Sequence, residues 1–314
     1  MDPELLVAGE CLVDFIPDSP GALSTVERFE RRAGGAPANV AVRLAGLDAT
    51  PYLWTRLGPD PFGDHLAATL EAHGIPDRFV VRDDDAKTSL AFVAHDESAD
   101  RQFSFYREAT ADTRFQPGTV PDAVLSSLSW VAFGGVALST EPARTAMVDL
   151  AERARKRGCT TFFDPNARPE LWDGGFADAI ETAFSLADVV KATPEDLAAA
   201  GIEGDPEALL ESVLSMGPHT GLLTLGEAGA RARATAEAPW APAETAHDGF
   251  DVDVVDTTGA GDGFTAGALC ALSEGESLDE AVAFASAVAA AAATREGAMS
   301  AAVDRERVRA IRDG

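Results

Sequence analysis

The chain has 314 residues, and its 52 acidic against 25 basic side chains give a formal net charge of −27 at pH 7. Nucleic acids and anionic membrane surfaces are recognised through clustered Lys and Arg, so this charge argues against both as partners. Apolar residues make up 46 % of the chain, which is ordinary for a globular protein with a substantial core. The acidic excess indicates a salt-rich cytoplasm, where salt screens the repulsion, or simply a highly soluble acidic protein.

Short apolar runs alternate with patterns of helical period along most of the chain. In chain order, the sequence predicts a strand over 5–8, a helix over 36–47, a strand over 51–57 and a helix over 61–72. The second half predicts a strand over 130–133, a helix over 141–157, strands over 160–164 and 188–191 around a helix over 176–186, a strand over 220–225, and helices from Ala260 and Ser277. Such βαβ units predict an α/β fold with a mainly parallel sheet flanked by helices on both faces.

Two segments, about 11–32 and 88–107, depart from this βαβ pattern. In them apolar and polar residues alternate with a period of two, with turn residues between the alternating runs. They predict antiparallel ribbons that pack together as a small, discontinuous β lid over the strand ends, where open α/β sheets bind ligands. No linker or repeat divides the chain, so residues 1–314 are expected to form one domain.

Cysteine and histidine patterns exclude several classes of site. Cys11, Cys159 and Cys270 are widely spaced, which argues against a disulfide framework or a thiolate metal site. The histidines show no HExxH pattern. Acidic residues interrupt the apolar N-terminus, so no signal peptide is expected, and the protein is expected to be cytoplasmic.

The segment Val255–Phe264, VDTTGAGDGF, is the most informative. Gly259, Ala260 and Gly261 precede a helix, so their backbone N–H groups lie at its positive end and can bind an anion such as a phosphoryl group. Asp262 would repel such an anion, and it is interpreted as the base that accepts the proton of an attacking alcohol. The alternative is that Asp262 only caps the helix. The sequence lacks both a P-loop and a GxGxxG after the first strand, which disfavours a Rossmann oxidoreductase.

The chain resembles the ribokinase/PfkB-type sugar kinases in DTTGAGD. The resemblance covers nearly the full length, through the early GG, the DPN, the GE.GA loop and the final TREGA. It implies a ribokinase-like twisted sheet, a β lid, and transfer of the ATP γ-phosphate to a sugar hydroxyl with Mg²⁺ as cofactor.

The resemblance also implies roles for individual residues. Asp262 would be the general base, the amides of Gly259, Ala260 and Gly261 the anion hole, and Arg168 a contact of the substrate or transferring phosphate, with a surface ion pair as its alternative. The implied sugar-binding residues are Asp14, Gly34, Gly35, Asn39, Tyr106 and Arg107, although the glycines also suit a plain turn. The implied nucleotide-binding residues are Thr224, Gly226, Gly229, Ser286 and Thr193, with helix packing as the alternative for Ser286.

Two cation sites are implied. Relatives often carry an NxxE near the phosphates, whereas this chain has KATPED, so either Glu195 or Asp196 would bind Mg²⁺ through water. A monovalent cation, K⁺ in a KCl-rich cytoplasm, would lie where relatives hold one, a position formed here by Asp256 and Thr258 with carbonyls near Ala293, Glu296 and Ala298.

The segments GECLVDFIP, GGAPANVA and FYREATADTRF most resemble bacterial-type fructokinases. The alternatives are a 2-keto-3-deoxygluconate kinase, whose substrate carboxylate Arg107 and Arg168 could meet, then a ribokinase and a nucleoside kinase. A catalytically silent sugar-binding regulator is disfavoured by the presence of Asp262. Lids of this family often pair between subunits, so a homodimer through Phe15, Ile16 or Phe103 is a further expectation.

Overall fold

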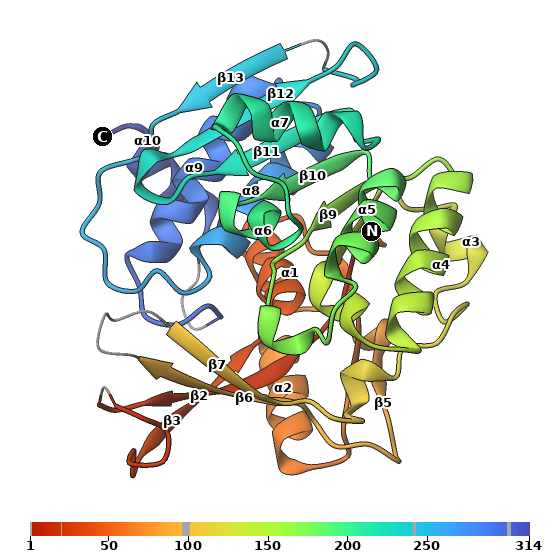
Figure 1. Ribbon diagram of the computed structural model, residues 1–314, viewed down its shortest axis with the longest axis vertical. Helices are drawn as coiled ribbons and strands as arrows, with labels where there is room; N and C mark the ends of the chain where they lie inside the picture. The colour runs from red at the N-terminus through yellow and green to blue at the C-terminus, as the bar shows by residue number, and fades with distance from the viewer. Residues whose placement is uncertain (1, 20, 96–100, 241–242, 300–302) are drawn as a thin grey trace.

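The computed structural model describes residues 2–19, 21–95, 101–240, 243–299 and 303–314. Its larger sheet contains nine strands and runs in Figure 1 from β13 at the top to β5 at the lower right. These strands are β1 (Leu5–Ala8), β4 (Tyr52–Leu57), β5 (Val80–Arg82), β8 (Trp130–Gly134), β9 (Thr160–Asp164), β10 (Val189–Ala192), β11 (Thr220–Thr224), β12 (Ala230–Ala234) and β13 (Ala243–His247). Their order is β13-β12-β11-β10-β9-β8-β1-β4-β5, and the strands from β11 to β5 are parallel. The predicted α/β class is therefore confirmed.

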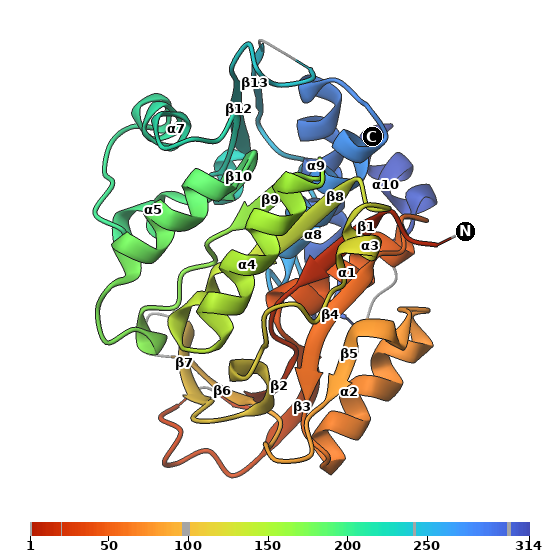
Figure 2. The ribbon, with the colours of Figure 1, turned by 90° about the vertical axis from the view of Figure 1, so that its right-hand side faces the viewer.

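Helices cover both faces of this sheet, as Figure 2 shows. One face packs against α1 (Ala36–Gly46), α2 (Pro61–Ala72), α8 (Ala260–Ser273), α9 (Leu278–Ala293) and α10 (Arg305–Arg312). The other packs against α3 (Asp122–Leu125), α4 (Ala143–Lys156), α5 (Phe176–Leu186), α6 (Pro194–Ala199) and α7 (Pro206–Ser215). Within the described ranges, no helix is both long and apolar enough to span a bilayer.

The alternation of strand side chains explains why there are two cores. In β1, Leu5 and Val7 join the core under α1 and α8, whereas Leu6 and Ala8 join the core under α4 and α5. Side chains of successive strand residues point to opposite faces, so a strand covered on both faces is a continuous apolar run.

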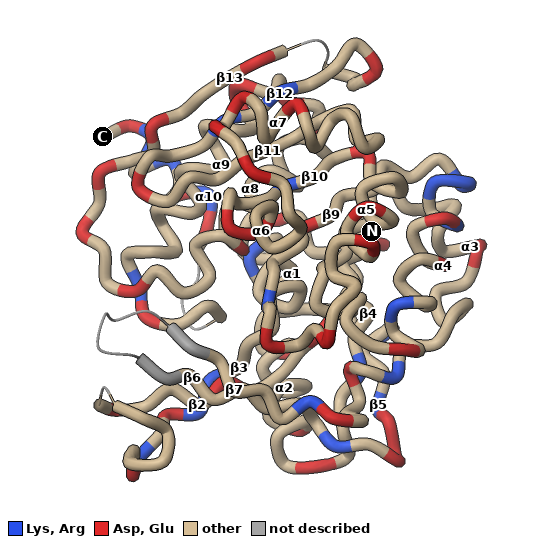
Figure 3. The backbone as a smooth tube through the Cα atoms, in the orientation of Figure 1, with Lys and Arg blue, Asp and Glu red and all other residues tan. Residues whose placement is uncertain are grey.

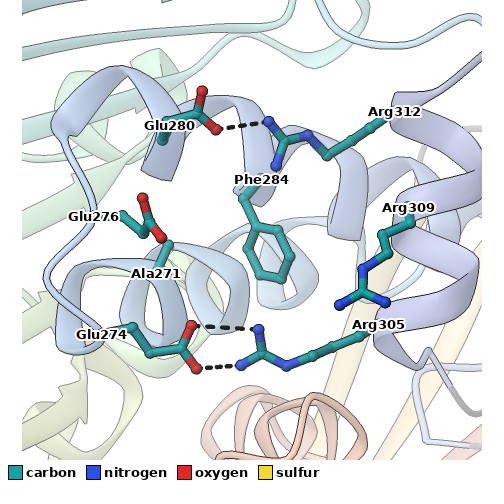
Figure 4. A pocket seen from close by; sticks show the side chains of 8 residues that line it. All are labelled: Ala271, Glu274, Glu276, Glu280, Phe284, Arg305, Arg309 and Arg312. Carbon is teal, nitrogen blue, oxygen red and sulfur yellow. Dashed lines mark hydrogen bonds and ion pairs between the residues drawn. The ribbon is translucent and has the colours of Figure 1, made fainter.

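The C-terminal helix α10 is fixed to α8 and α9 by ion pairs at a surface pocket. Arg305 pairs with Glu274 at the end of α8, and Arg312 pairs with Glu280 of α9, as Figure 4 shows. Arg309 and Glu276 line the same pocket, and Phe284 lies at its base. Three carboxylates thus face three guanidinium groups, so this pocket has no surplus of positive charge that would attract an anion.

A second, smaller sheet contains β2 (Leu12–Pro17), β3 (Phe29–Gly34), β6 (Leu90–His95) and β7 (Arg101–Tyr106), in the order β3-β2-β6-β7. It lies at the lower left of Figure 1. The two predicted ribbons are present as the antiparallel pairs β2–β3 and β6–β7, and a parallel pairing of β2 with β6 joins them. Of the segment predicted for the lid, residues 96–100 lie outside the described residues.

The acidic excess lies mainly at the surface. Figure 3 shows Asp and Glu spread along the whole chain, and most of those described are exposed or half-buried. Among the described residues, six acidic side chains are buried: Glu10, Asp60, Asp83, Asp112, Asp164 and Asp196. Several of these accept hydrogen bonds from backbone amides or Arg, which lowers the cost of burying a charge.

Candidate active site

The site centres on the N-terminus of α8. Gly259 is the N-cap residue with φ 77°, and a Cβ there would lie 2.8 Å from Cβ of Ala298. Glycine is therefore required by both conformation and space. No side chain caps the helix, so Asp262 is not its N-cap residue. The first amides of this 14-residue helix lie at the positive end of its dipole, which is the geometry expected for anion binding.

Asp262 lies in the first turn of α8, beside α1. Its Oδ2 accepts a hydrogen bond of 2.7 Å from Nδ2 of Asn39. Burial raises the pKa of the Asp262 carboxyl, and the charge of Asp164 raises it further; Asn39, Lys191 and Arg168 act in the opposite direction. A carboxylate with a raised pKa is a stronger base than an exposed one.

A buried ion pair lies next to Asp262 and was not predicted from the sequence. Nζ of Lys191 donates to Oδ2 of Asp164 at 3.2 Å, and Oγ1 of Thr265 donates to the same oxygen at 2.9 Å. Burial alone would lower the pKa of Lys191, but the charges of Asp164, Asp196 and Asp262 raise it. The ammonium therefore stays charged, and the pair ties the carboxyl ends of β9 and β10 to α8.

The predicted sugar-binding segments meet where the two sheets join. A Cβ at Gly34 would lie 2.0 Å from Oδ2 of Asp14, so the glycine leaves room for that carboxylate. Gly35 has φ 100°, and a Cβ there would lie 2.5 Å from the carbonyl oxygen of Glu10. Gly34 ends β3, which pairs with the β2 strand that carries Asp14, and Gly35 is the N-cap of the helix that carries Asn39.

Glu10 is another residue that was not predicted from the sequence. It is 2 % exposed, its Oε1 accepts from the amide of Ala36 at 3.3 Å, and its Oε2 has no hydrogen-bond partner. Burial raises the pKa of Glu10 to about 7, against the opposing charges of Arg107 and Arg168. The protonated carboxyl is thus favoured at this position up to about pH 7, well above the range of an exposed glutamate.

Arg168 lies between the two sheets. Its Nη1 donates to the carbonyl of Ala167 at 2.7 Å, and its guanidinium carbon lies 5.1 Å from the centre of the Phe103 ring. It forms none of the ion pairs found among the described residues, in contrast to the surface-pair alternative. Its planar cation is therefore placed to meet an anionic or hydroxyl-bearing ligand.

Two predicted sugar contacts are placed differently from the expectation. All three guanidinium nitrogens of Arg107 are already engaged, by Asp112 and by Ser139. Tyr106 is 65 % exposed and contacts Phe92 on the face of the small sheet that also carries Phe15. That both face the sugar stays a prediction, but Arg107 is held in a buried ion pair with Asp112 and Tyr106 lies on the face of the small sheet opposite Asp14.

The predicted nucleotide-binding residues lie on separate elements. Thr224 ends β11, and Gly226 and Gly229 follow it in the turn to β12; both glycines have positive φ. Ser286 is 6 % exposed within α9, and its Oγ has no hydrogen-bond partner. Thr193 is the N-cap of α6, where its Oγ1 accepts from the amide of Asp196 at 3.1 Å.

Asp196 and Glu195 differ in availability for Mg²⁺. The carboxylate of Asp196 is buried and accepts from the amides of Ala167 and Thr193 at 2.7 and 2.9 Å, whereas Glu195 is exposed. No cluster of three potential metal ligands occurs in the described part of the chain. This still fits Mg²⁺, because that ion keeps several waters and uses one or two carboxylates together with substrate phosphates.

The loop predicted to hold a monovalent cation is well ordered by hydrogen bonds. Oδ1 of Asp256 accepts from the amide and the hydroxyl of Thr258, and its Oδ2 accepts from the amide of Gly297. The carbonyl of Ala293 accepts from the amides of Val255 and Asp256. Nη2 of Arg32 in β3 forms an ion pair with Oε2 of Glu296 at 3.2 Å, so the small sheet contacts this loop. Ala298 packs against Gly259 at the start of α8.

Comparison with known proteins agrees with this arrangement. Residues 2–305 match the model of the pfkB family carbohydrate kinases. The chain belongs to this family. It is therefore a carbohydrate kinase, a phosphotransferase with an alcohol group as acceptor.

Named relatives of this kinase include the probable fructokinase-4 of Arabidopsis thaliana, which is 33 % identical over 98 % of this chain and 95 % of its own. A crystal structure of fructokinase with bound ATP from Xylella fastidiosa has a TM-score of 0.86 and 30 % identity, covering 98 % of this chain and 97 % of that chain. A fructokinase double mutant from Vibrio cholerae O395, in fructose, ADP and potassium ion bound form, has a TM-score of 0.83 and 28 % identity over 99 % of both chains.

Proposed function

We propose that this kinase phosphorylates fructose with ATP as the phosphoryl donor. The observation that carries the proposal is the hydrogen bond of 2.7 Å that joins Asp262, in the first turn of α8, to Asn39, which follows the Gly34-Gly35 segment. This contact supports the proposal, because it would hold a base, anion-binding amides and a sugar-binding segment close to one another. The named fructokinase relatives favour fructose over the other sugars of the family.

In the proposed reaction, Asp262 accepts the proton of a fructose hydroxyl while that oxygen attacks the γ-phosphorus. The new O–P bond forms as the bond from phosphorus to the bridging oxygen of ADP breaks, and negative charge on the phosphoryl oxygens is met by the amides of Gly259, Ala260 and Gly261. Asp14 would hold sugar hydroxyls, and Arg168 would contact the sugar or the phosphoryl group.

The cofactor proposals follow from the same site. Mg²⁺, which would neutralise phosphate charge when bound, is expected near Glu195 rather than Asp196, because Glu195 is exposed and the Asp196 carboxylate is buried. K⁺ is proposed beside Asp256 and Thr258. The turn after β11, with Thr224, Gly226 and Gly229, and the α9 residue Ser286 are proposed to border the nucleotide.

The small sheet is proposed to act as the lid of a single 1–314 domain. Its face with Asp14 and Phe103 is turned toward the site, as the contact of Phe103 with Arg168 indicates. Its other face exposes Tyr106, and pairing of this face with a second copy is the proposed dimer contact. Analytical ultracentrifugation of Tyr106→Ser against the wild type tests this pairing, and an unchanged dimer fraction would argue against it.

The function is tested by an ATP-dependent coupled assay with fructose, 2-keto-3-deoxygluconate and ribose. Fructose is expected to give the highest kcat/KM, and Asp262→Asn is expected to lower kcat with fructose by roughly 10²–10⁴-fold, because it removes general-base catalysis. Lack of turnover with all three sugars would refute the proposed function. Retention of most of the rate by Asp262→Asn would refute the role of this residue alone.

We also propose that the acidic surface is an adaptation to a salt-rich cytoplasm. The free energy of unfolding is then expected to rise from low salt to molar KCl, because salt screens repulsion among the surface carboxylates. Urea unfolding at several KCl concentrations measures this, with NaCl as the control for ion-specific binding. A stability that does not rise with either salt would contradict the proposal.

A further inference from the structure

Lys191 directs a buried ammonium toward the N-terminus of α8. It lies near the carboxyl end of β10, on the strand face that also carries Val189, which belongs to the core under α8 and α9. Lys191 is 4 % exposed. A long cationic side chain is seldom buried to this extent unless it is paired, so its partners define what it does.

The hydrogen bonds of this ammonium are incomplete. An ammonium carries three N–H donors, and within the described residues Lys191 has one acceptor, Oδ2 of Asp164 at 3.2 Å. That oxygen also accepts from Thr265, and Oδ1 of Asp164 accepts from the amide of Asn166 at 3.1 Å. Two donors of a buried cation thus remain for a partner outside the protein, and leaving them unsatisfied is unfavourable.

The position of the ammonium indicates which partner this is. Gly261 has no side chain, and a Cβ there would lie 3.5 Å from Nζ of Lys191. The ammonium therefore borders the amides at the start of α8, on the same side as Asp262. We propose that Lys191 binds the transferred phosphoryl group directly, as a cationic partner of the Gly259–Gly261 amides; this rests on the proposed kinase function.

A cation at this position would stabilise the transition state of phosphoryl transfer. Charge is spread over the equatorial oxygens of the phosphoryl group in the transition state, and a preorganised donor in a water-poor site stabilises it strongly. Asp164 holds the ammonium in place, so no reorganisation is needed at the moment of reaction. Asp164 raises the pKa of Asp262, whereas Lys191 lowers it. Together with Arg168 and Asn39, Lys191 therefore helps to keep the base ionised.

The alternative is that Lys191 and Asp164 form only a structural ion pair that ties β9 and β10 to α8. Four variants separate the two roles: Lys191→Met, Lys191→Arg, the double variant Lys191→Met/Asp164→Asn, and Lys156→Met as a control on an exposed lysine of α4. The single Met variant leaves Asp164 as an unpaired buried charge and is expected to be destabilised. The double variant removes both charges and is expected to recover stability.

Steady-state kinetics with the best sugar give the first readout. Lys191→Met is expected to lower kcat by about 10²–10³-fold, while the KM for the sugar stays within about threefold of the wild type. Lys191→Arg is expected to recover part of the rate, and Lys156→Met is expected to match the wild type. The double variant is expected to regain its melting temperature but not its kcat. If the double variant also regains kcat, the pair is structural and the inference is wrong.

A calorimetric titration gives a readout that needs no sugar. Lys191→Met and the double variant are expected to bind ATP about tenfold more weakly than the wild type and to bind ADP unchanged, because a charge-assisted hydrogen bond to the γ-phosphoryl group is lost. Equal affinities for ATP in the wild type and the double variant would overturn the assignment. Because this titration decides Lys191 even when fructose is not turned over, failure of the inference and failure of the proposed function are distinguishable.

Discussion

The buried carboxyl of Glu10 makes the stability of this protein dependent on pH in an unusual direction. Glu10 follows β1, is 2 % exposed, and has one carboxyl oxygen without a hydrogen-bond partner. Burial raises its pKa from the ordinary 4.5 to about 7, despite the attraction of Arg107 and Arg168. The folded state therefore holds a proton that the unfolded state has released between these two pH values. The stability gained from this proton is fully present below pH 4.5 and is lost as the pH rises through 7.

The size of the effect follows from the two pKa values. One pKa unit corresponds to about 1.36 kcal/mol. With a pKa of 4.5 in the unfolded chain and about 7 in the folded protein, the free energy of unfolding falls by about 2.5 kcal/mol between pH 5 and pH 8. Glu10→Gln keeps the shape of the side chain but removes its titration. The free-energy difference between this variant and the wild type should then move by about 2.5 kcal/mol in favour of Gln as the pH rises from 5 to 8.

Urea unfolding at pH 5, 6, 7 and 8 measures this difference directly, because all other titrating groups are common to both proteins. Glu71→Gln, on the exposed surface of α2, is the matched control and should show no such trend. A constant difference between Glu10→Gln and the wild type across the range would refute the reasoning. It would mean that the Glu10 carboxyl ionises in the folded protein as it does in the unfolded chain.

Two further predictions concern the connections between the sheets. Arg107→Met leaves the fully buried Asp112 carboxylate unpaired and is expected to lower the free energy of unfolding by about 3–5 kcal/mol, with a fructose KM within about threefold of the wild type. Urea unfolding and the coupled assay check this, and a large KM change in a stable variant would restore Arg107 as a sugar contact. Gly35→Ala must adopt φ 100° and place its Cβ 2.5 Å from the Glu10 carbonyl, so a loss of about 1–3 kcal/mol is expected. An unchanged melting temperature would show that this turn relaxes freely.

Elements with strong local signals were predicted closely. The helix over Pro61–Ala72 begins after Asp60, whose side chain accepts from the amides of Phe62 and Gly63, and it has Pro at its first position. The strand over Thr160–Asp164 is an apolar run that ends at a carboxylate and a proline. Such caps and apolar runs depend on neighbours in sequence, and this is why they can be recognised without the fold.

Elements that depend on the rest of the fold were missed. The edge strand Ala230–Ala234 has the sequence ARARA, and its partner Ala243–His247 has AETAH, so neither carries the large β-branched or aromatic residues that mark a strand. They form strands because β11 offers a free edge to pair with. The short helices Pro194–Ala199 and Pro206–Ser215 have the proline starts of helices but too few turns for a clear period.

The site was predicted where it is contiguous in sequence and missed where it is assembled in space. GAGD could be recognised from residues 259–262 alone. Asp164 and Lys191 end separate strands, and only the parallel pairing of β9 with β10 brings them to Asp262. Tyr106 is a similar case, because only the pairing of β2 with β6 and of β6 with β7 places it on the face opposite Asp14.

The scarcity of lysine gives the net charge of −27 a more specific meaning. The chain has three lysines; Lys87 and Lys156 are exposed, whereas Lys191 is buried beside three carboxylates. An anionic nucleotide approaching so acidic a surface is repelled at long range, but salt screens exposed charges beyond about 10 Å at 0.1 M. Within the site, the α8 amides, Lys191 and Arg168 are close to the position expected for the phosphoryl group and are screened far less. The negative surface and the binding of phosphate are thus compatible because they act over different distances, and raising the salt concentration weakens the repulsion more than the attraction.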